Sequence, residues 1–263
     1  MRRVVRLLGY GGIAAFVGGV VALHGLRANL DPTSHTISEY SLGDYGWLMR
    51  VAFGSLGLGV AATAIGLRWS FGSSLWRWLG YLSLAATAVG LFLDAGYNTD
   101  RPGVSETFDG SVHGDGMLIV CLSLPAATYI LGRELSRFTP RLQQTKMLQA
   151  LGPAQLVGVL GFEISPPAWR GATERIAVTM GVVGVALLQS LVTPYRRKTK
   201  GWEAAHSPPI LSPQTFQVVT PVDSGLTAMA FDATNPTRTE TNPLETGGGP
   251  PHPAACESQP MRR

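Results

Sequence analysis

The sequence predicts an all-α, polytopic integral membrane protein, with a six-helix transmembrane bundle over residues 1–200 and a disordered cytoplasmic tail over residues 201–263. Three observations support this fold class. The chain is 45% hydrophobic and only 14% charged. Its charges are clustered, which leaves six long windows without Asp, Glu, Lys or Arg, as in membrane spans rather than in a soluble core. After residue 200 the composition changes to Pro, Thr, Ser, Gly and Asn, which bury too little apolar area to offset the ordering entropy.

The six windows predict helices at about residues 7–26, 47–67, 76–97, 115–132, 147–163 and 175–195. Several windows are too short for a hydrocarbon core of about 30 Å, so we expect these helices to run on into charged flanks. Arg2, Arg3 and Arg6 precede the first window, as in a signal peptide, but the window is too long for one and no clean cleavage site follows.

Small residues recur inside the predicted spans. Gly57, Gly59 and Ala62 have the spacing of a dinucleotide-binding fingerprint, but they lie within a predicted apolar helix rather than after a strand. We therefore interpret them as positions where helix backbones approach closely. Pro125 and Pro153 fall within the fourth and fifth spans, where we expect kinks.

The basic residues predict the orientation of the spans. Up to Lys200, thirteen Lys and Arg residues fall on the side of the two termini, and five fall on the other side, namely Arg27, Arg50, Arg101, Arg170 and Arg175. The positive-inside rule then predicts a plasma-membrane protein with both termini in the cytoplasm. The pI near 9.3 reflects this topology, and nucleic acid is not an expected partner. The expected partner is the lipid bilayer, with lipid headgroups as a candidate ligand.

The first outward loop, residues 31–43, predicts a short interfacial helix. Thr36 and Glu39 have the spacing of a capping box, and Gly43 is a suitable stop. On such a helix His35 and Glu39 would share a face, because they are four residues apart. This pair can bind a metal or pass a proton, or it can form an ordinary hydrogen bond on the helix.

The other two outward loops carry the remaining candidates. Asp100 lies in the second loop, and His113 and Asp115 lead into the fourth span. A neutral imidazole at His113 can be a metal ligand, a general base or a group that caps the helix. In the third loop Arg170 can bind a phosphate or anchor the loop at the interface, and Glu174 precedes the sixth span.

Four of these segments resemble a bacterial and archaeal membrane family called domain of unknown function 998. They are Ile37-Ser38-Glu39-Tyr40, Thr99-Asp100-x-Pro102-Gly103, Gly110-x-x-His113-Gly114 and Glu174-Arg175. The similarity extends over about residues 5–195, although Tyr97 stands where members typically have Phe. The resemblance implies a six-helix membrane protein and assigns no reaction.

The sequence leaves three functional hypotheses. The first is a sensing or scaffolding membrane protein with an outward polar pocket of Glu39, Asp100 and His113, joined in some arrangements by His35, Asp115, Arg170 and Glu174. The second is a membrane-embedded enzyme that acts on lipid headgroups through an acid/histidine site or through a metal held by His113, Asp100 and Glu39. The third is a transporter, which is disfavoured because no span carries a charge at mid-depth. No cofactor is indicated.

Overall fold

The structure is a computed structural model that describes residues 1–101, 103–138 and 142–192. These residues contain six long helices, two short 3-10 helices and no strand, so the all-α prediction is confirmed for this part of the chain. The predicted tail and the end of the last predicted span lie outside the described residues. In chain order the elements are α1 (Arg2–Leu26), η1 (Ser38–Ser41), α2 (Gly46–Phe71), α3 (Leu75–Gly96), α4 (Phe108–Leu135), α5 (Leu142–Glu163), η2 (Pro167–Trp169) and α6 (Arg170–Leu191).

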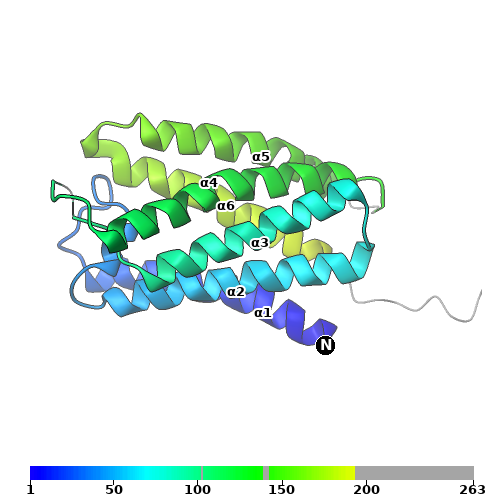
Figure 1. Ribbon diagram of the computed structural model, residues 1–263, viewed down its shortest axis with the longest axis horizontal. Coiled ribbons are helices and arrows are strands. Elements are labelled where there is room, and N and C mark those ends of the chain that lie inside the picture. The colour runs from blue at the N-terminus through cyan, green and yellow to red at the C-terminus, as the bar shows by residue number, and fades with distance from the viewer. Residues whose placement is uncertain (102, 139–141, 193–263) are drawn as a thin grey trace, which may run out of the picture. The chain divides into compact units, whose positions relative to one another are not determined.

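Five of the long helices, all except α5, are long and apolar enough to cross a membrane. Helix α5 has the same length as α3 and lies beside α4 (Figure 1). It is less apolar because it carries a lysine and several glutamines, which are Gln143, Gln144, Lys146, Gln149 and Gln155. The described part of the chain therefore has five helices that could span a membrane by their length and composition.

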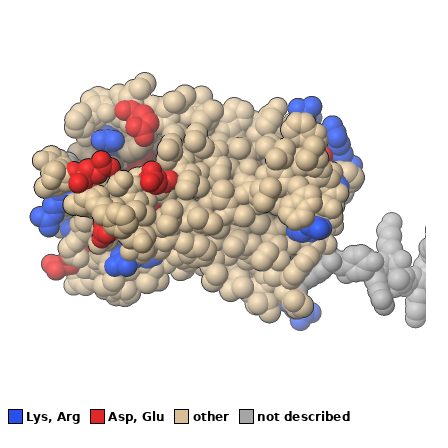
Figure 2. Space-filling model, viewed as in Figure 1, with Lys and Arg blue, Asp and Glu red and all other residues tan. Residues whose placement is uncertain are grey.

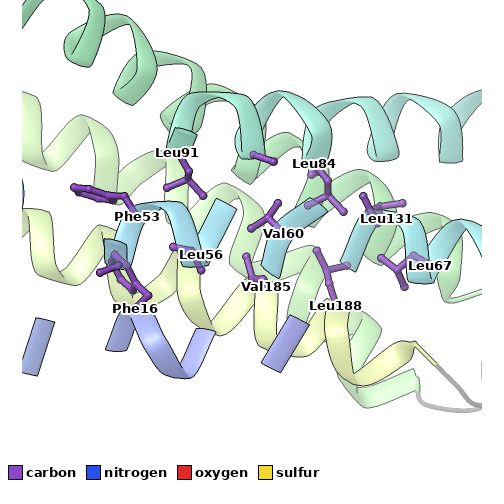
Figure 3. Close-up of a cluster of buried hydrophobic side chains, with 14 of the residues drawn as sticks. Phe16, Phe53, Leu56, Val60, Leu67, Leu84, Leu91, Leu131, Val185 and Leu188 are labelled. Atoms are coloured by element: carbon purple, nitrogen blue, oxygen red, sulfur yellow. The ribbon is translucent and has the colours of Figure 1, made fainter. Parts of the chain in front are cut away.

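The helices pack as a bundle in which each long helix contacts the next one along the chain. Helix α6 also contacts α1, α2 and α4, whereas α5 packs mainly on α4 and α6. Figure 3 shows the buried side chains that join these helices. Its labelled members are Phe16, Phe53, Leu56, Val60, Leu67, Leu84, Leu91, Leu131, Val185 and Leu188.

The contact between α1 and α2 depends on glycine. A Cβ atom on Gly12 would lie 2.3 Å from the carbonyl oxygen of Ser55 and 2.8 Å from the Cα atom of Gly59. The two backbones therefore touch at this point, which is the role that the sequence predicts for small residues in the spans.

Four helices begin at least five residues before the spans that the sequence predicts, namely α1, α4, α5 and α6. Helix α4 begins at Phe108 rather than near residue 115, because Thr107 caps it by accepting a hydrogen bond from the Gly110 N–H at 3.1 Å. Helix α6 begins at Arg170 rather than near residue 175. The predicted spans begin next to charged residues, whereas these helices begin within the charged flanks, which is the extension that the short windows predict.

Charge is distributed unequally between the two ends of the bundle. The loops at 27–45, 97–107 and 164–169 form one end, called the acidic end below, where Figure 2 shows a cluster of carboxylates. The opposite end, which holds the N-terminus and residues 72–74 and 136–138, shows mainly Lys and Arg (Figure 2).

Candidate functional site

A cavity of about 640 Å³ lies at the acidic end, between the loops and helices α4, α5 and α6. This volume falls within the roughly 300–1,000 Å³ of small-molecule sites. Five of the seven candidates from the sequence line it, namely Glu39, Asp100, His113, Arg170 and Glu174. The other lining residues are Ser34, Thr36, Ser38, Thr99, Gly114, Met117, Leu118, Cys121, Leu122, Leu156, Val159, Leu160, Phe162, Glu163 and Pro167.

The first loop places Glu39 in the cavity wall. The predicted capping box is present, because the Thr36 N–H donates to Glu39 Oε1 and the Glu39 N–H donates to Thr36 Oγ1, each at 3.3 Å. The expected short helix is a 3-10 helix of four residues, η1, whose N-cap is Ile37, so His35 lies outside it. His35 Nε2 nevertheless lies 4.0 Å from Glu39 Oε2. The side chain of His35 is 38% exposed, and this residue does not line the cavity.

Glu174 and Arg175 hold this loop against the start of α6. The buried Glu174 carboxylate accepts the Ile37 N–H. One Nη atom of Arg175 donates to the carbonyl oxygens of Pro32 and His35, both at 2.7 Å. The other Nη atom donates to the Tyr40 hydroxyl at 3.3 Å. One wall of the cavity is therefore a loop that is fixed to α6 by side chains of opposite charge.

Asp100 fixes the second loop to the start of α4. Its carboxylate accepts the Thr107 N–H at 2.9 Å and the Thr107 hydroxyl at 2.7 Å. These two bonds, from the backbone and then from the side chain, lower the pKa of Asp100. Thr107 in turn caps α4, so Asp100 holds in place the residue that caps this helix.

The lowered pKa of Asp100 predicts that the hydrogen bonds that hold the second loop depend on pH. A carboxyl group with a lower pKa in the folded state contributes stability at neutral pH that is lost as pH falls through that pKa. We expect the Thr107 amide to exchange faster with solvent deuterium in Asp100→Asn than in the wild type at neutral pH. Lowering the pH should weaken protection in the wild type only. The neighbouring exposed Glu106 is the control, and Glu106→Gln with the same loss of protection would contradict this role of Asp100.

His113 lines the cavity from α4 and is 3% exposed. Its Nδ1 lies 3.2 Å from the Tyr97 carbonyl oxygen and 3.6 Å from Asp94 Oδ1. Asp94 is fully buried on α3, and its carboxylate lies against Gly116 of α4, where a Cβ atom would be 2.5 Å away. Within the described residues, both Asp94 oxygens and His113 Nε2 lack a hydrogen-bond partner. Buried polar atoms normally have a partner, and these three have none in the described part of the chain although they are closed off from the surface.

The described residues contain no group of three or more His, Cys, Asp or Glu side chains placed to hold a metal ion. His113, Asp100 and Glu39 line the same cavity but do not form such a group. Asp115 is exposed on α4 and does not line the cavity.

Arg170 and Glu163 lie at the cavity edge where α5 ends and α6 begins. The guanidinium of Arg170 lies 5.0 Å from the ring centre of Phe162, which also lines the cavity. Among the described residues, neither Arg170 nor Glu163 forms an ion pair. Both charges therefore remain available to a ligand.

The comparisons with known proteins identify a family without a known activity. The family model described as protein of unknown function (DUF998) matches residues 10–190. The chain belongs to this family. No curated protein and no solved structure matches the chain. The residues matched by the DUF998 model include every described residue that lines the cavity.

The sequence did not indicate the role of three residues that are central to the geometry of this DUF998 chain. Asp94 ends an apolar window, which gives no signal for its burial, and its carboxyl group is buried against Gly116 of α4. Arg175 was noted as part of the start of the last span, but no motif indicated that it holds the first loop. Glu163 also had no signal beyond its place at the end of a window.

Proposed function

We propose that this chain is a plasma-membrane sensor that crosses the bilayer six times, with both termini in the cytoplasm, and binds an extracytoplasmic ligand in the cavity at the acidic end. The unequal charge of the two ends supports the orientation, because the basic end belongs in the cytoplasm. The cavity then opens toward the outside of the cell.

The connectivity supports a sixth crossing by α5. Helix α4 ends at the basic end and α6 begins at the acidic end, so the chain between them has to return along the bundle. Helix α5 makes this passage while it packs on α4 and α6. One polar side chain of α5 has its partner within the bundle, because Gln155 donates to the Met180 carbonyl oxygen of α6 at 3.0 Å.

The observation that carries the sensing proposal is the double role of the acids in the cavity wall. Glu39, Asp100 and Glu174 line the cavity and also accept the hydrogen bonds that fix the two loops. A ligand that binds these carboxylates competes with or strengthens the loop contacts. Ligand binding is thereby coupled to the position of the loops, which is the requirement for a signal to another protein.

Accessibility of introduced cysteines tests the orientation and the opening of the cavity together. We place one cysteine at a time in a chain whose Cys121 and Cys256 are replaced by serine. Thr99→Cys, in the cavity wall, should react with a membrane-impermeant maleimide on intact cells. The control Ser73→Cys, exposed between α2 and α3, should react only after the membrane is opened. The reverse pattern would overturn the orientation, and no reaction of Thr99→Cys before or after opening would overturn an open cavity.

A second function, hydrolysis of a lipid headgroup, is favoured by the pair of His113 and Asp94. His113 lines the cavity, its Nδ1 lies 3.6 Å from the buried Asp94 carboxyl group, and a histidine side chain at a cavity wall is the commonest general base in enzymes. Release of a soluble product from phospholipid vesicles by the wild type, and not by His113→Asn, would favour this enzyme over the sensor.

A further inference from the structure

The cavity at the acidic end is not closed toward the membrane. Four leucines line it while also lying on the lipid-facing surface of the bundle, Leu118 and Leu122 on α4 and Leu156 and Leu160 on α5. Their exposed fractions are 57%, 57%, 42% and 56%. The cavity therefore reaches the bilayer through the seam between α4 and α5, which is called the leucine seam below.

The apolar lining continues inward from the same place. A smaller cavity of about 80 Å³ lies deeper between the helices and is lined mainly by apolar side chains. It shares Met117, Cys121, Val159, Phe162 and Glu174 with the larger cavity. The site thus has a polar region at the acidic end and apolar surface on two sides, the leucine seam and the inner cavity. This division fits an amphipathic molecule rather than a wholly polar one.

The charges in the cavity wall restrict which polar headgroup an amphipathic ligand can have. Four carboxyl side chains line the larger cavity, those of Glu39, Asp100, Glu163 and Glu174, and Arg170 is the one Lys or Arg among the described lining residues. An anionic headgroup would meet this excess of carboxyl groups. A headgroup with one phosphate and one ammonium can place the phosphate at Arg170 and the ammonium at Glu163.

A primary ammonium fits better than a quaternary one. Carboxylates accept hydrogen bonds, and a primary ammonium donates three while a choline group donates none. Choline sites are commonly built from several Trp, Tyr or Phe rings, and Phe162 is the one residue of these types in the described lining.

We propose that the cavity binds a phospholipid with a phosphoethanolamine headgroup from the outer leaflet, which enters sideways along the leucine seam. Its ammonium is bound by Glu163, its phosphate by Arg170, and its acyl chains follow the leucine seam. This inference rests on the proposed extracytoplasmic site and names its ligand.

Binding of short-chain lipids to the delipidated full-length protein in detergent tests the headgroup. The probes are dihexanoyl phosphatidylethanolamine, the matching phosphatidylcholine and phosphatidylglycerol, and glycerophosphoethanolamine, which lacks acyl chains. We expect the phosphatidylethanolamine to bind about tenfold or more tightly than each of the others, which corresponds to the loss of one good charged contact or of the apolar contacts. Equal affinity for the three lipids would overturn headgroup recognition. Equally tight binding of glycerophosphoethanolamine would show a soluble ligand and overturn entry from the membrane.

Three variants, each with a matched control, test the residues. Arg170→Gln and Glu163→Gln should each weaken binding of dihexanoyl phosphatidylethanolamine about tenfold. Arg101→Gln and Glu106→Gln, exposed in the second loop and outside the cavity lining, should not. Leu160→Trp should weaken binding by filling the leucine seam, whereas Val157→Trp, 68% exposed on α5 and outside the lining, should not. Unchanged affinity in Arg170→Gln, Glu163→Gln and Leu160→Trp, each with wild-type thermal stability, would overturn the proposal.

The cysteine experiment distinguishes a failure of the lipid proposal from a failure of the proposed function. If phosphatidylethanolamine fails to bind while Thr99→Cys still reacts from outside the cell, the lipid is wrong and the outward cavity stands. If Thr99→Cys fails to react from either side, the site itself is wrong.

Discussion

Gly12→Leu is expected to prevent α1 from packing on α2. The Cβ atom of any side chain at this position meets the Ser55 carbonyl oxygen and the Gly59 Cα atom, which belong to backbone and cannot rotate away. Overpacking of this kind costs about 1–3 kcal/mol of folding free energy in well-packed cores. We expect a cost at the upper end of this range for Gly12→Leu, because the new side chain meets backbone atoms. Such a loss is a large fraction of the stability of a domain. The measurement is the thermal unfolding midpoint of the detergent-purified protein, together with its yield as a single species.

The neighbouring glycine provides a matched control for Gly12→Leu. A Cβ atom on Gly11 has no atom within 4 Å, and this residue is exposed on α1. Gly11→Leu should therefore keep a midpoint close to that of the wild type, since lipid or detergent solvates the new side chain. Equal midpoints for the two variants would contradict the close contact between α1 and α2.

Arg175→Ala is expected to release the first loop from α6. The guanidinium donates to two loop carbonyl oxygens and to the Tyr40 hydroxyl, and its Nε donates to His24 Nε2 at 3.1 Å. Hydrogen bonds to a charged group contribute about 1.5–3 kcal/mol each, and the partial exposure of Arg175 limits the total to roughly 2–4 kcal/mol. We expect a lower unfolding midpoint and faster protease cleavage within residues 31–41.

Two further substitutions separate the guanidinium geometry from charge alone. Arg175→Lys keeps the charge but has one nitrogen in place of three. Its unfolding midpoint should therefore lie between those of Arg175→Ala and the wild type. Arg101→Ala, in the exposed second loop, should leave the midpoint and the cleavage rate unchanged. If Arg175→Ala shows no faster cleavage than Arg101→Ala, the loop is held by other contacts, such as the hydrogen bond from the Ala172 N–H to the Thr33 carbonyl oxygen at 3.0 Å.

Most of the fold could be predicted from the spacing of charged residues. Each predicted span corresponds to one long helix within the described residues, because long windows without charge are rare outside membranes. The starts of α4 and α6 could not be predicted in this way, since Asp109, Asp115 and Glu174 lie inside these helices. Composition also could not show whether α5 crosses the membrane, because its glutamines lower its apolarity, and the case for a crossing depends on the chain direction.

The candidate site could be predicted in part. Antiparallel neighbours bring alternate loops to one end of a bundle, and this rule led to Glu39, Asp100 and His113, which line one cavity. Sequence spacing could not separate residues that face the cavity from those that face away, so His35 and Asp115 were included. Asp94 was missed because burial of a charge near the end of a span depends on a glycine of the neighbouring helix, Gly116, that is distant in the sequence.

A cryo-electron microscopy structure in nanodiscs that contain phosphatidylethanolamine tests the central claim most directly. The claim predicts a lipid with its headgroup between Glu163 and Arg170 and its chains along Leu118, Leu122, Leu156 and Leu160. A cavity that contains only water, with lipids ordered elsewhere on the bundle and none in the seam between α4 and α5, would contradict it.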